Sequence, residues 1–309
     1  MKIAIDLNGG DKAPEEILKG CLDFLKNHTH DEIILCTTKE TYEILLSGLI
    51  QPGLSIEFFT HSIGMKETPV KSIKDKPDNT IKGALKLVKD KKASCAFSCG
   101  NSGSVILNAV NIFGLKDPDV NPSLISFIPM YERPPLALFD VGALGNYNFN
   151  ADLNFAILHE AVGIYTKLYG MKNPEIRLLN IGTESWKGTP EHRKMYQMLS
   201  ESLYNFTGNI EGDELLSSSA SIIITDGLTG NIVLKLLESF NDMIIKFKDL
   251  KDCKFDNNYL NFLIEDFNYE TTGGAPLMGV NGKVMIGHGK SSAKAVKAAL
   301  ELCVKYAEI

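Results

Sequence analysis

The chain has 309 residues, of which 44% are hydrophobic and 23% charged, as in an ordinary globular protein. Its formal net charge of −6 argues against a chain built mainly to bind nucleic acid, so no nucleic-acid partner is expected. Arginine occurs only at Arg133, Arg177 and Arg193, so backbone amides, lysines and asparagines would have to carry any recognition of phosphate.

The first third of the chain alternates predicted strands with predicted helices. Residues 2–5, 32–37 and 54–59 are β-branched apolar runs and read as strands. Helices are predicted over 13–25 and 40–49, between these strands.

A strongly basic stretch follows, from Lys66 to Lys92, with nine lysines against four acidic residues. Its second half, 79–89, has the apolar spacing of a helix. This stretch is a reasonable docking site for an acidic partner protein, although a solvated helix face is the plainer reading. The candidate docking residues are Lys71, Lys74 and Lys76.

The remaining elements keep the same alternation. Strands are predicted at 96–98, 124–128, 138–139, 177–180, 222–225 and 284–286, and helices at 151–169, 232–250, 292–306 and after Thr189-Pro190. Such an order indicates an α/β fold with a doubly wound, mostly parallel sheet. We expect residues 1–309 to form one large α/β domain, or two lobes with a crossover near 118–122 and a cleft between them.

Five of these strands run directly into a polar loop that contains glycine and then into a helix. The loops begin at Asn8, Gly100, Asp140, Asn180 and Asp226. A loop of this kind presents unpaired backbone N–H groups at a helix N-terminus, which favours an anion. If the five strands are parallel neighbours, the loops share one edge of the sheet and line a phosphate site.

Familiar nucleotide and hydrolase motifs fail at single positions. Gly289-Lys290-Ser291 has Val284 where a P-loop needs glycine, and Gly287-His288-Gly289 has Ser292 where a dinucleotide loop needs one. Gly100-Asn101-Ser102-Gly103 is followed by Ser104, which breaks the hydrolase elbow. The sequence therefore predicts phosphate binding without nucleotide chemistry.

Eight short segments rich in glycine and asparagine occur in a characteristic order. They are Asp6-Leu7-Asn8-Gly9-Gly10-Asp11, 98–103, Asp140-Val141-Gly142, Asn180-Ile181-Gly182 with Lys187-Gly188, Gly208-Asn209 with Glu211-Gly212, Thr225-Asp226-Gly227 with Thr229-Gly230-Asn231, 273–282 and His288-Gly289. Together they resemble the bacterial phosphate acyltransferase family (PlsX), from about residue 2 to 300. Two departures stand out. That family usually has methionine where Asn8 stands, and Leu144-Gly145 enlarge the loop before Asn146.

The resemblance implies an enzyme of fatty acid and phospholipid biosynthesis that makes acyl phosphate from acyl-acyl carrier protein and inorganic phosphate. It implies an α/β/α sandwich related to phosphotransacetylases and isocitrate dehydrogenases, a homodimer, and no metal or organic cofactor. Phosphate is already a nucleophile near neutral pH, so positioning and stabilisation of the oxyanion should dominate catalysis.

Roles are assigned on the matching positions. Lys187 is the first choice of cation for the phosphate or oxyanion, Asn231 a polar partner, and His288 a proton donor to the departing thiolate. Glycines of these loops serve tight turns equally well, and the aspartates serve as caps equally well. The expected phosphate and acyl-binding residues are Gly9, Gly10, Asp11, Gly100, Asn101, Ser102, Gly103, Asp140, Asn209, Asp226, Gly227 and Thr229.

The cysteines indicate the cellular compartment of the protein, and one helix is a candidate contact with a membrane. The six cysteines form no C-x-x-C pair, no signal peptide is evident, and no apolar run approaches the ~20 residues of a membrane span, so a cytoplasmic protein is expected. The broad apolar stripe of the helix at 232–250 reads as core or dimer interface. With the lysines that follow it, 232–254 is also a candidate peripheral membrane contact.

Other functions stay open beside the acyltransferase. A short-chain phosphotransacetylase acting on acyl-coenzyme A shares the chemistry and the fold class. A decarboxylating dehydrogenase of the related fold is disfavoured by the scarcity of arginine. A catalytically silent scaffold that binds carrier protein is kept open by the altered loop at Leu144-Gly145.

Overall fold

The structure, a computed structural model, describes residues 1–143, 149–251, 263 and 267–309. These residues form two compact units: unit 1 comprises residues 1–116 and 272–309, and unit 2 comprises 117–271. The chain first leaves unit 1 after Lys116, next to the proline-bearing connector at 118–122. A cleft between lobes stays a prediction.

Unit 1 is built on a mostly parallel sheet. Its strands, in spatial order, are β3 (Leu54–Phe59), β2 (Glu32–Thr38), β1 (Lys2–Asp6), β4 (Cys95–Ser98), β11 (Val284–Gly287) and β10 (Gly274–Met278). Neighbours from β3 to β11 pair in parallel, and β10 pairs antiparallel with β11. All four residues of β4 are buried. Their burial on both faces explains why this strand is a continuous apolar run.

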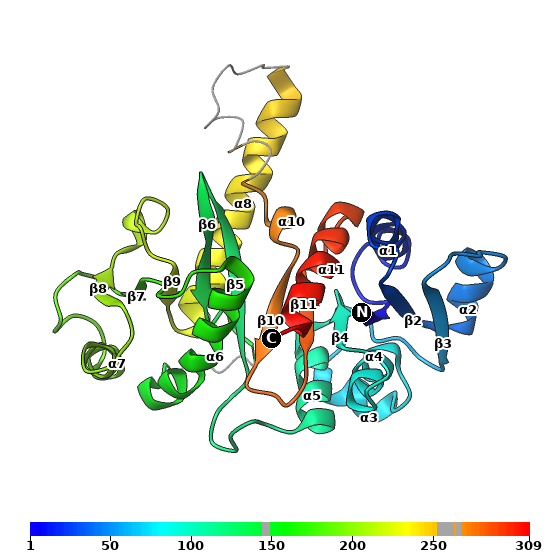
Figure 1. The fold of residues 1–309 in the computed structure, drawn as a ribbon, viewed down its shortest axis with the longest axis horizontal. Coiled ribbons are helices and arrows are strands. Elements are labelled where there is room, and N and C mark those ends of the chain that lie inside the picture. Colours follow the sequence, from blue (N-terminus) through cyan, green and yellow to red (C-terminus); the bar gives the residue numbers. More distant parts are fainter. Residues whose placement is uncertain (144–148, 252–262, 264–266) are drawn as a thin grey trace. The chain divides into compact units, whose positions relative to one another are not determined.

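Helices cover two sides of this sheet. Figure 1 shows α1 and α11 together on one side of β1 and β4, and α3, α4 and α5 on the other. Gly20 lets α1 approach α11 closely, since a Cβ there would lie 2.8 Å from the carbonyl oxygen of Ala293. The helical segments of unit 1 are α1 (Glu15–Asn27), α2 (Lys39–Thr41), the π-helical turn η1 (Tyr42–Leu46), α3 (Pro69–Asp75), α4 (Thr80–Lys89), α5 (Ser102–Phe113) and α11 (Ala293–Ala307).

The strands of unit 2 form a second, mostly parallel group. Its strands, in spatial order, are β5 (Ser123–Met130), β6 (Arg133–Phe139), β9 (Ile222–Ile224), β7 (Ile176–Leu179) and β8 (Phe206–Ile210). The hairpin β5–β6 is antiparallel, and the pairs from β6 to β8 are parallel. The helical segments of unit 2 within the described residues are α6 (Ala151–Tyr169), α7 (Pro190–Ser200), the 3₁₀ turn η2 (Gly212–Glu214) and α8 (Gly227–Lys251), with α10 (Tyr269–Thr272) at the boundary to unit 1.

The predicted fold class, a doubly wound and mostly parallel α/β sheet, is confirmed. The five strands that lead into glycine loops are not all neighbours, and one edge shared by all five loops stays a prediction. Strands β1 and β4 are neighbours in unit 1, and β6, β9 and β7 are neighbours in unit 2. The loops therefore form two groups, one in each unit.

Three local predictions also need correction. The helix predicted at 40–49 is a short α-turn followed by the π-turn η1. Helix α8 begins at Gly227 and not at Ile232, because the side chain of Asp226 caps the backbone N–H groups of Leu228 and Thr229. Strands β8 and β10 were not predicted, since each contains glycine within a short and weakly apolar run.

Candidate active site

Asp6 is a buried carboxyl group at the end of β1. The hydroxyl of Ser98, at the end of the neighbouring strand β4, donates to its Oδ2 at 2.7 Å. The same hydroxyl accepts a hydrogen bond from the backbone N–H of Gly100 at 3.0 Å. Burial raises the pKa of Asp6, and the nearby Thr80 hydroxyl, the hydrogen bond from Ser98 and the backbone of Asn8 offset part of that effect. Asp6 thus connects the two strands whose loops follow.

The loops after β1 and β4 touch each other through glycine backbone. A Cβ on Gly9 would collide with the carboxyl of Asp6 and would lie 2.8 Å from the backbone nitrogen of Gly100. Gly10 has a φ of +122°, a conformation that other residues rarely adopt. Glycine is therefore required at both positions for packing, whatever else these residues bind.

Asn101 and Ser102 begin helix α5. The Oδ1 of Asn101 accepts from the backbone N–H of Ser104 at 3.0 Å, so Asn101 is the N-cap. Its Nδ2 donates to the carbonyls of Met65 and Glu67, at 2.9 and 3.1 Å. The Asn101 side chain thereby holds the 65–67 loop. Ser102 is exposed, and its hydroxyl has no protein partner among the residues that the structure describes.

His288 belongs to the same group of loops. The backbone N–H of Asp11 donates to the carbonyl of Gly289 at 2.7 Å, which places the His288 loop against the Gly9-Gly10-Asp11 loop. The Nδ1 of His288 accepts from the backbone N–H of Lys290 at 3.2 Å, and the ring is partly exposed. Unit 1 therefore brings His288 together with the predicted loops 9–11 and 100–103.

In unit 2, the turn at Asp140 packs on the first turn of α8. Asp140 has a φ of +67°, and its Oδ1 accepts from the backbone N–H of Gly142 at 3.0 Å. Burial raises the pKa of Asp140, the hydrogen bond from Gly142 and the nearby Ser123 hydroxyl and Ala143 backbone lower it, and the nearby Asp226 raises it further. A Cβ on Gly230 would overlap the carbonyl oxygen of Asp140, so this close contact requires glycine.

Asp226, Thr229 and Asn231 lie at that same helix start. Asp226 accepts hydrogen bonds from the backbone N–H groups of Leu228 and Thr229 and from the hydroxyl of Thr229. A Cβ on Gly142 would lie 3.4 Å from the Cβ of Asn231, so Asn231 borders the Asp140 turn. The structure thus brings together Asp140, Asp226, Gly227, Thr229 and Asn231.

Lys187 stands in the loop after β7, which is held by two asparagines. Asn180 donates from Nδ2 to the carbonyl of Lys187 at 3.2 Å, and buried Asn209 donates to the carbonyl of Glu184 at 2.8 Å. Lys187 is partly exposed, and no ion pair joins it to any residue within the described ranges. Asn209 therefore supports the loop that carries Lys187.

His192 lies beside this loop and is not among the site residues predicted from the sequence. It stacks on Phe149, with ring centroids 4.7 Å apart, and its Cβ lies 2.8 Å from where a Cβ on Gly188 would be. Burial lowers the pKa of His192, and the charge of Asp226 acts in the opposite direction. The sequence does place His192 three residues after Thr189, the N-cap of α7. The hydroxyl of Thr189 lies 2.7 Å from the Nδ1 of His192.

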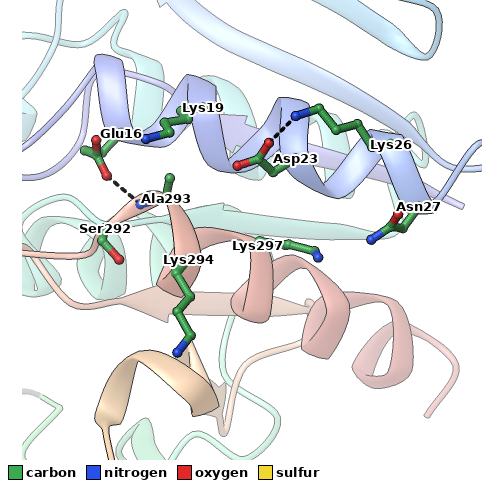
Figure 2. A pocket seen from close by; sticks show the side chains of 9 residues that line it. All are labelled: Glu16, Lys19, Asp23, Lys26, Asn27, Ser292, Ala293, Lys294 and Lys297. Carbon is green, nitrogen blue, oxygen red and sulfur yellow. Dashed lines mark hydrogen bonds and ion pairs between the residues drawn. The ribbon is translucent and has the colours of Figure 1, made fainter. Parts of the chain in front are cut away.

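Two lysine groups occur in unit 1. On α3, Lys71 and Lys74 are exposed, whereas Lys76 pairs with Glu67 at 2.7 Å and donates to the carbonyl of Ser62. The second group lines a cavity of about 500 Å³ between α1 and α11 (Figure 2). Its lysines are Lys19, Lys26, Lys294 and Lys297.

Acidic groups partly neutralise this second cavity. The carboxylate of Glu16 accepts from the backbone N–H of Ala293 at 2.7 Å and so occupies the first turn of α11 (Figure 2). The pKa of Asp23 is lowered by its hydrogen bond to Lys26 and by the charges of Lys26, Lys19 and Lys297. The α1–α11 cavity is therefore a mixed charged surface and not a free anion site.

Comparison with known proteins assigns the family. Residues 1–308 match the family model described as fatty acid synthesis protein. A phosphate acyltransferase from Dehalococcoides mccartyi is 35% identical, over all of this chain and 91% of that protein. One from Dictyoglomus turgidum is 32% identical, over all of this chain and 95% of the relative. The chain belongs to the phosphate acyltransferase family. The predicted family membership is confirmed, and with it the prediction that the chain is an enzyme, an acyltransferase.

Solved structures show the same fold in other enzymes. A phosphotransacetylase from Streptococcus pyogenes superposes with a TM-score of 0.62 at 16% identity, covering all of this chain and 94% of the other. A branched-chain phosphotransacylase from Enterococcus faecalis V583 gives a TM-score of 0.64 at 14% identity, covering 99% of each chain. These likenesses confirm the phosphotransacetylase-like fold of this phosphate acyltransferase family member.

Several expectations for this family member remain predictions. The roles of the site residues rest on the resemblance, and the enlarged loop at Leu144-Gly145, with Asn146, lies outside the described residues. No group of three or more His, Cys, Asp and Glu side chains placed to hold a metal occurs in the described ranges. Within the same ranges, every helix is too short or too polar to cross a membrane.

Proposed function

We propose that this chain transfers a fatty acyl group from acyl-acyl carrier protein to inorganic phosphate, giving acyl phosphate for phospholipid synthesis. The observation that carries the proposal is the contact between the loops after β1 and β4. There buried Gly9 packs against Gly100 beside the first turn of α5, where the N–H groups of the helix N-terminus and the helix dipole attract an anion. The exposed hydroxyl of Ser102 adds a donor at that turn.

The family supports the same acceptor. The relatives that match this chain over its whole length are named phosphate acyltransferase. In those proteins the name gives phosphate as the acceptor and an acyl group as the group transferred. With arginine restricted to three positions, phosphate recognition by backbone amides and lysine fits this chain.

The proposed reaction is a direct displacement. A phosphate oxygen attacks the thioester carbonyl carbon, a C–O bond forms, and the tetrahedral oxyanion collapses as the C–S bond breaks. The electron pair leaves with sulfur, and His288 supplies the proton that makes the free thiol. Lys187 stabilises negative charge on the phosphate or the oxyanion, and Asn231 offers an amide donor.

A second candidate is supported by the fold. The solved neighbours include phosphotransacetylases, so an acyl-coenzyme A donor deserves a direct comparison with the carrier protein. A silent scaffold that binds carrier protein is the third outcome to test.

The test uses the full chain with phosphate and a series of thioesters. Acyl phosphate is trapped with hydroxylamine and measured as the hydroxamate. We expect hydroxamate from long-chain acyl-carrier protein and none from acetyl-coenzyme A. Hydroxamate from acetyl-coenzyme A and from no other thioester would contradict the proposal and support a short-chain phosphotransacetylase activity. Absence of product from every thioester would favour the scaffold.

We propose that the carrier protein docks on α3. Lys71 and Lys74 are exposed there without ion pairs to described residues, so their charge is available to an acidic partner. Lys76 is tied to Glu67 and contributes less free charge. The contact should weaken with salt because exposed charges are screened.

Helix α8 supports a proposed homodimer. Ile232, Leu236, Phe240 and Met243 follow one face, and each is exposed by 44% or more. Such an exposed stripe marks an interaction surface. We assign it first to a second copy of the chain and second to a membrane surface, over 232–254, of which 252–254 lie outside the described residues. Light scattering tests the first assignment, and co-sedimentation with anionic liposomes tests the second.

A cytoplasmic location is proposed on the described cysteines. Cys21, Cys36, Cys95, Cys99 and Cys303 are all buried and free of disulfides. Free buried thiols suit a reducing compartment.

A further inference from the structure

A cavity of about 640 Å³ lies beside the predicted phosphate loop in unit 1. It is lined by residues that follow β1, β2 and β3, three parallel neighbours whose carboxyl ends share one edge of the sheet. Open α/β sheets bind ligands at that edge. The volume falls in the range of about 300–1,000 Å³ that is usual for small-molecule sites.

Asn8 joins this cavity to the Gly9-Gly10 loop. Its Nδ2 donates to the hydroxyl of Thr41 at 2.7 Å, and its Oδ1 accepts from the hydroxyl of Thr37 at 3.0 Å. The hydroxyl of Thr38 donates to that of Thr41 at 3.1 Å. The wall nearest the phosphate loop is therefore a hydrogen-bonded set of hydroxyl and amide groups.

The other polar residues of the lining carry equal numbers of lysines and carboxylates. Thr60 donates to the carboxylate of Asp78 through both its hydroxyl and its backbone N–H. Lys76 donates to the carbonyl of Ser62 at 2.8 Å. Lys39 and Glu40 add one charge of each sign to the lining. The positive charges of this lining are thus matched by carboxylates.

One wall is aromatic. Phe58 is 46% exposed and meets the ring of Tyr42 edge-on, with centroids 5.1 Å apart. Phe59 packs on α4 at Gly83, where a Cβ would overlap its ring. The cavity thus offers hydroxyl and amide groups on two sides and an apolar ring between them.

This lining disfavours two classes of ligand. A bare anion is disfavoured because Glu40 and Asp78 are part of the wall. A fatty acyl chain is disfavoured because burying these hydroxyl and charged groups against it would leave them without water. A narrow chain of amides and hydroxyls with a small apolar group fits both the polar walls and the Phe58 ring.

We propose that this cavity binds the pantetheine arm that carries the thioester in acyl carrier proteins, an inference that rests on the proposed function. The arm has two amides, one hydroxyl and a gem-dimethyl group. Its amides and hydroxyl meet the threonine and asparagine groups, and the gem-dimethyl group packs on Phe58. Lys76 lines the cavity and follows α3, so a carrier docked at Lys71 and Lys74 reaches its mouth. Asn8, at the other end, leads to the phosphate loop.

The first test compares two acyl donors that differ only in the arm. Acyl-pantetheine contains the whole arm, and acyl-N-acetylcysteamine keeps the thioester with one amide. We expect Phe58→Ala to lower the ratio of their kcat/KM values about tenfold, the scale of one lost apolar contact in a pocket. Phe58→Leu keeps an apolar wall and should restore most of the ratio. Ile50→Ala, at a residue 93% exposed outside the cavity, is the control and should keep the wild-type ratio.

The second test measures binding without catalysis. Calorimetric titration of 4′-phosphopantetheine into the full chain should show saturable binding that Phe58→Ala weakens and Ile50→Ala does not. An unchanged donor ratio in Phe58→Ala, or no saturable binding, overturns the inference while the acyltransferase stands. If 4′-phosphopantetheine binds at this cavity but no thioester yields acyl phosphate, the inferred arm site is supported and the proposed function is contradicted.

Discussion

The hydroxyl of Ser98 donates to the carboxyl of Asp6 at 2.7 Å and joins the ends of two neighbouring strands, β4 and β1. Because Ser98 also accepts from the backbone of Gly100, the strand ends and the loop after β4 form one hydrogen-bonded unit. Gly9 packs against this unit on the Asp6 side. The geometry of the proposed phosphate loops therefore depends on a carboxyl group that is itself too buried to touch substrate.

Asp6→Asn tests that dependence through pH. Burial raises the folded-state pKa of Asp6 above its ordinary value of 3.8, so folding favours the protonated carboxyl. Its contribution to the free energy of unfolding is full below about pH 4 and is lost as pH rises through the folded-state pKa. Urea denaturation should show the stability of Asp6→Asn rising relative to wild type as pH rises from acid to neutral. A difference that stays constant with pH contradicts this account.

Gly9→Ala should disturb the contact between the two loops. The new Cβ would meet the carboxyl of Asp6 and the backbone of Gly100, which cannot rotate away. We expect a loss of about 1–3 kcal/mol in the free energy of unfolding, as for other overpacked sites, together with a raised KM for phosphate. Gly163→Ala is the matched control, because nothing lies within 4 Å of its Cβ position within α6. It should stabilise the helix by about 0.5–1 kcal/mol. Equal effects at both sites would refute the loop contact.

Lys187→Ala tests the proposed cation. Removing one preorganised donor to an oxyanion typically lowers kcat about 100- to 1,000-fold, and we expect that range in steady-state assays. Thermal unfolding should change little, since Lys187 makes no ion pair with the described residues. Lys172→Ala, at an exposed lysine of the same unit, should keep wild-type kcat. A Lys187→Ala enzyme with normal kcat removes this residue from the mechanism.

Reversal of charge at α3 tests carrier docking. The double change Lys71→Glu and Lys74→Glu should raise KM for acyl-carrier protein roughly tenfold at low salt, with a smaller effect at high salt. Lys19→Glu with Lys294→Glu, in the α1–α11 cavity of Figure 2, makes the same change in net charge elsewhere in unit 1. If the second pair raises KM equally, the effect is one of overall charge and α3 is not the docking surface.

Much of the fold could be predicted because local signals were strong. The helix predicted at 151–169 has the bounds that the structure shows, and Thr189 with Pro190 starts α7 as its cap and first residue. The strand predicted at 54–59 is likewise observed as β3. Periodicity and capping are properties of a few adjacent residues, so one sequence reveals them.

The site was less predictable, because its contacts join distant segments. Binding of phosphate by the Asn101 side chain stays a prediction, and the structure shows that this side chain caps α5 and holds the carbonyls of Met65 and Glu67. Nothing near residue 65 marks it as a partner of residue 101. The grouping of glycine loops into two units also depends on strand order, which periodicity does not encode.

The most direct measurement follows both products of the proposed displacement in one reaction. Long-chain acyl-carrier protein and phosphate are incubated with the full chain, the released thiol is titrated, and acyl phosphate is quantified by ³¹P NMR. The proposed transfer to phosphate predicts thiol and acyl phosphate in equal amounts, both dependent on added phosphate. Thiol release without acyl phosphate, or no release at all, would contradict it.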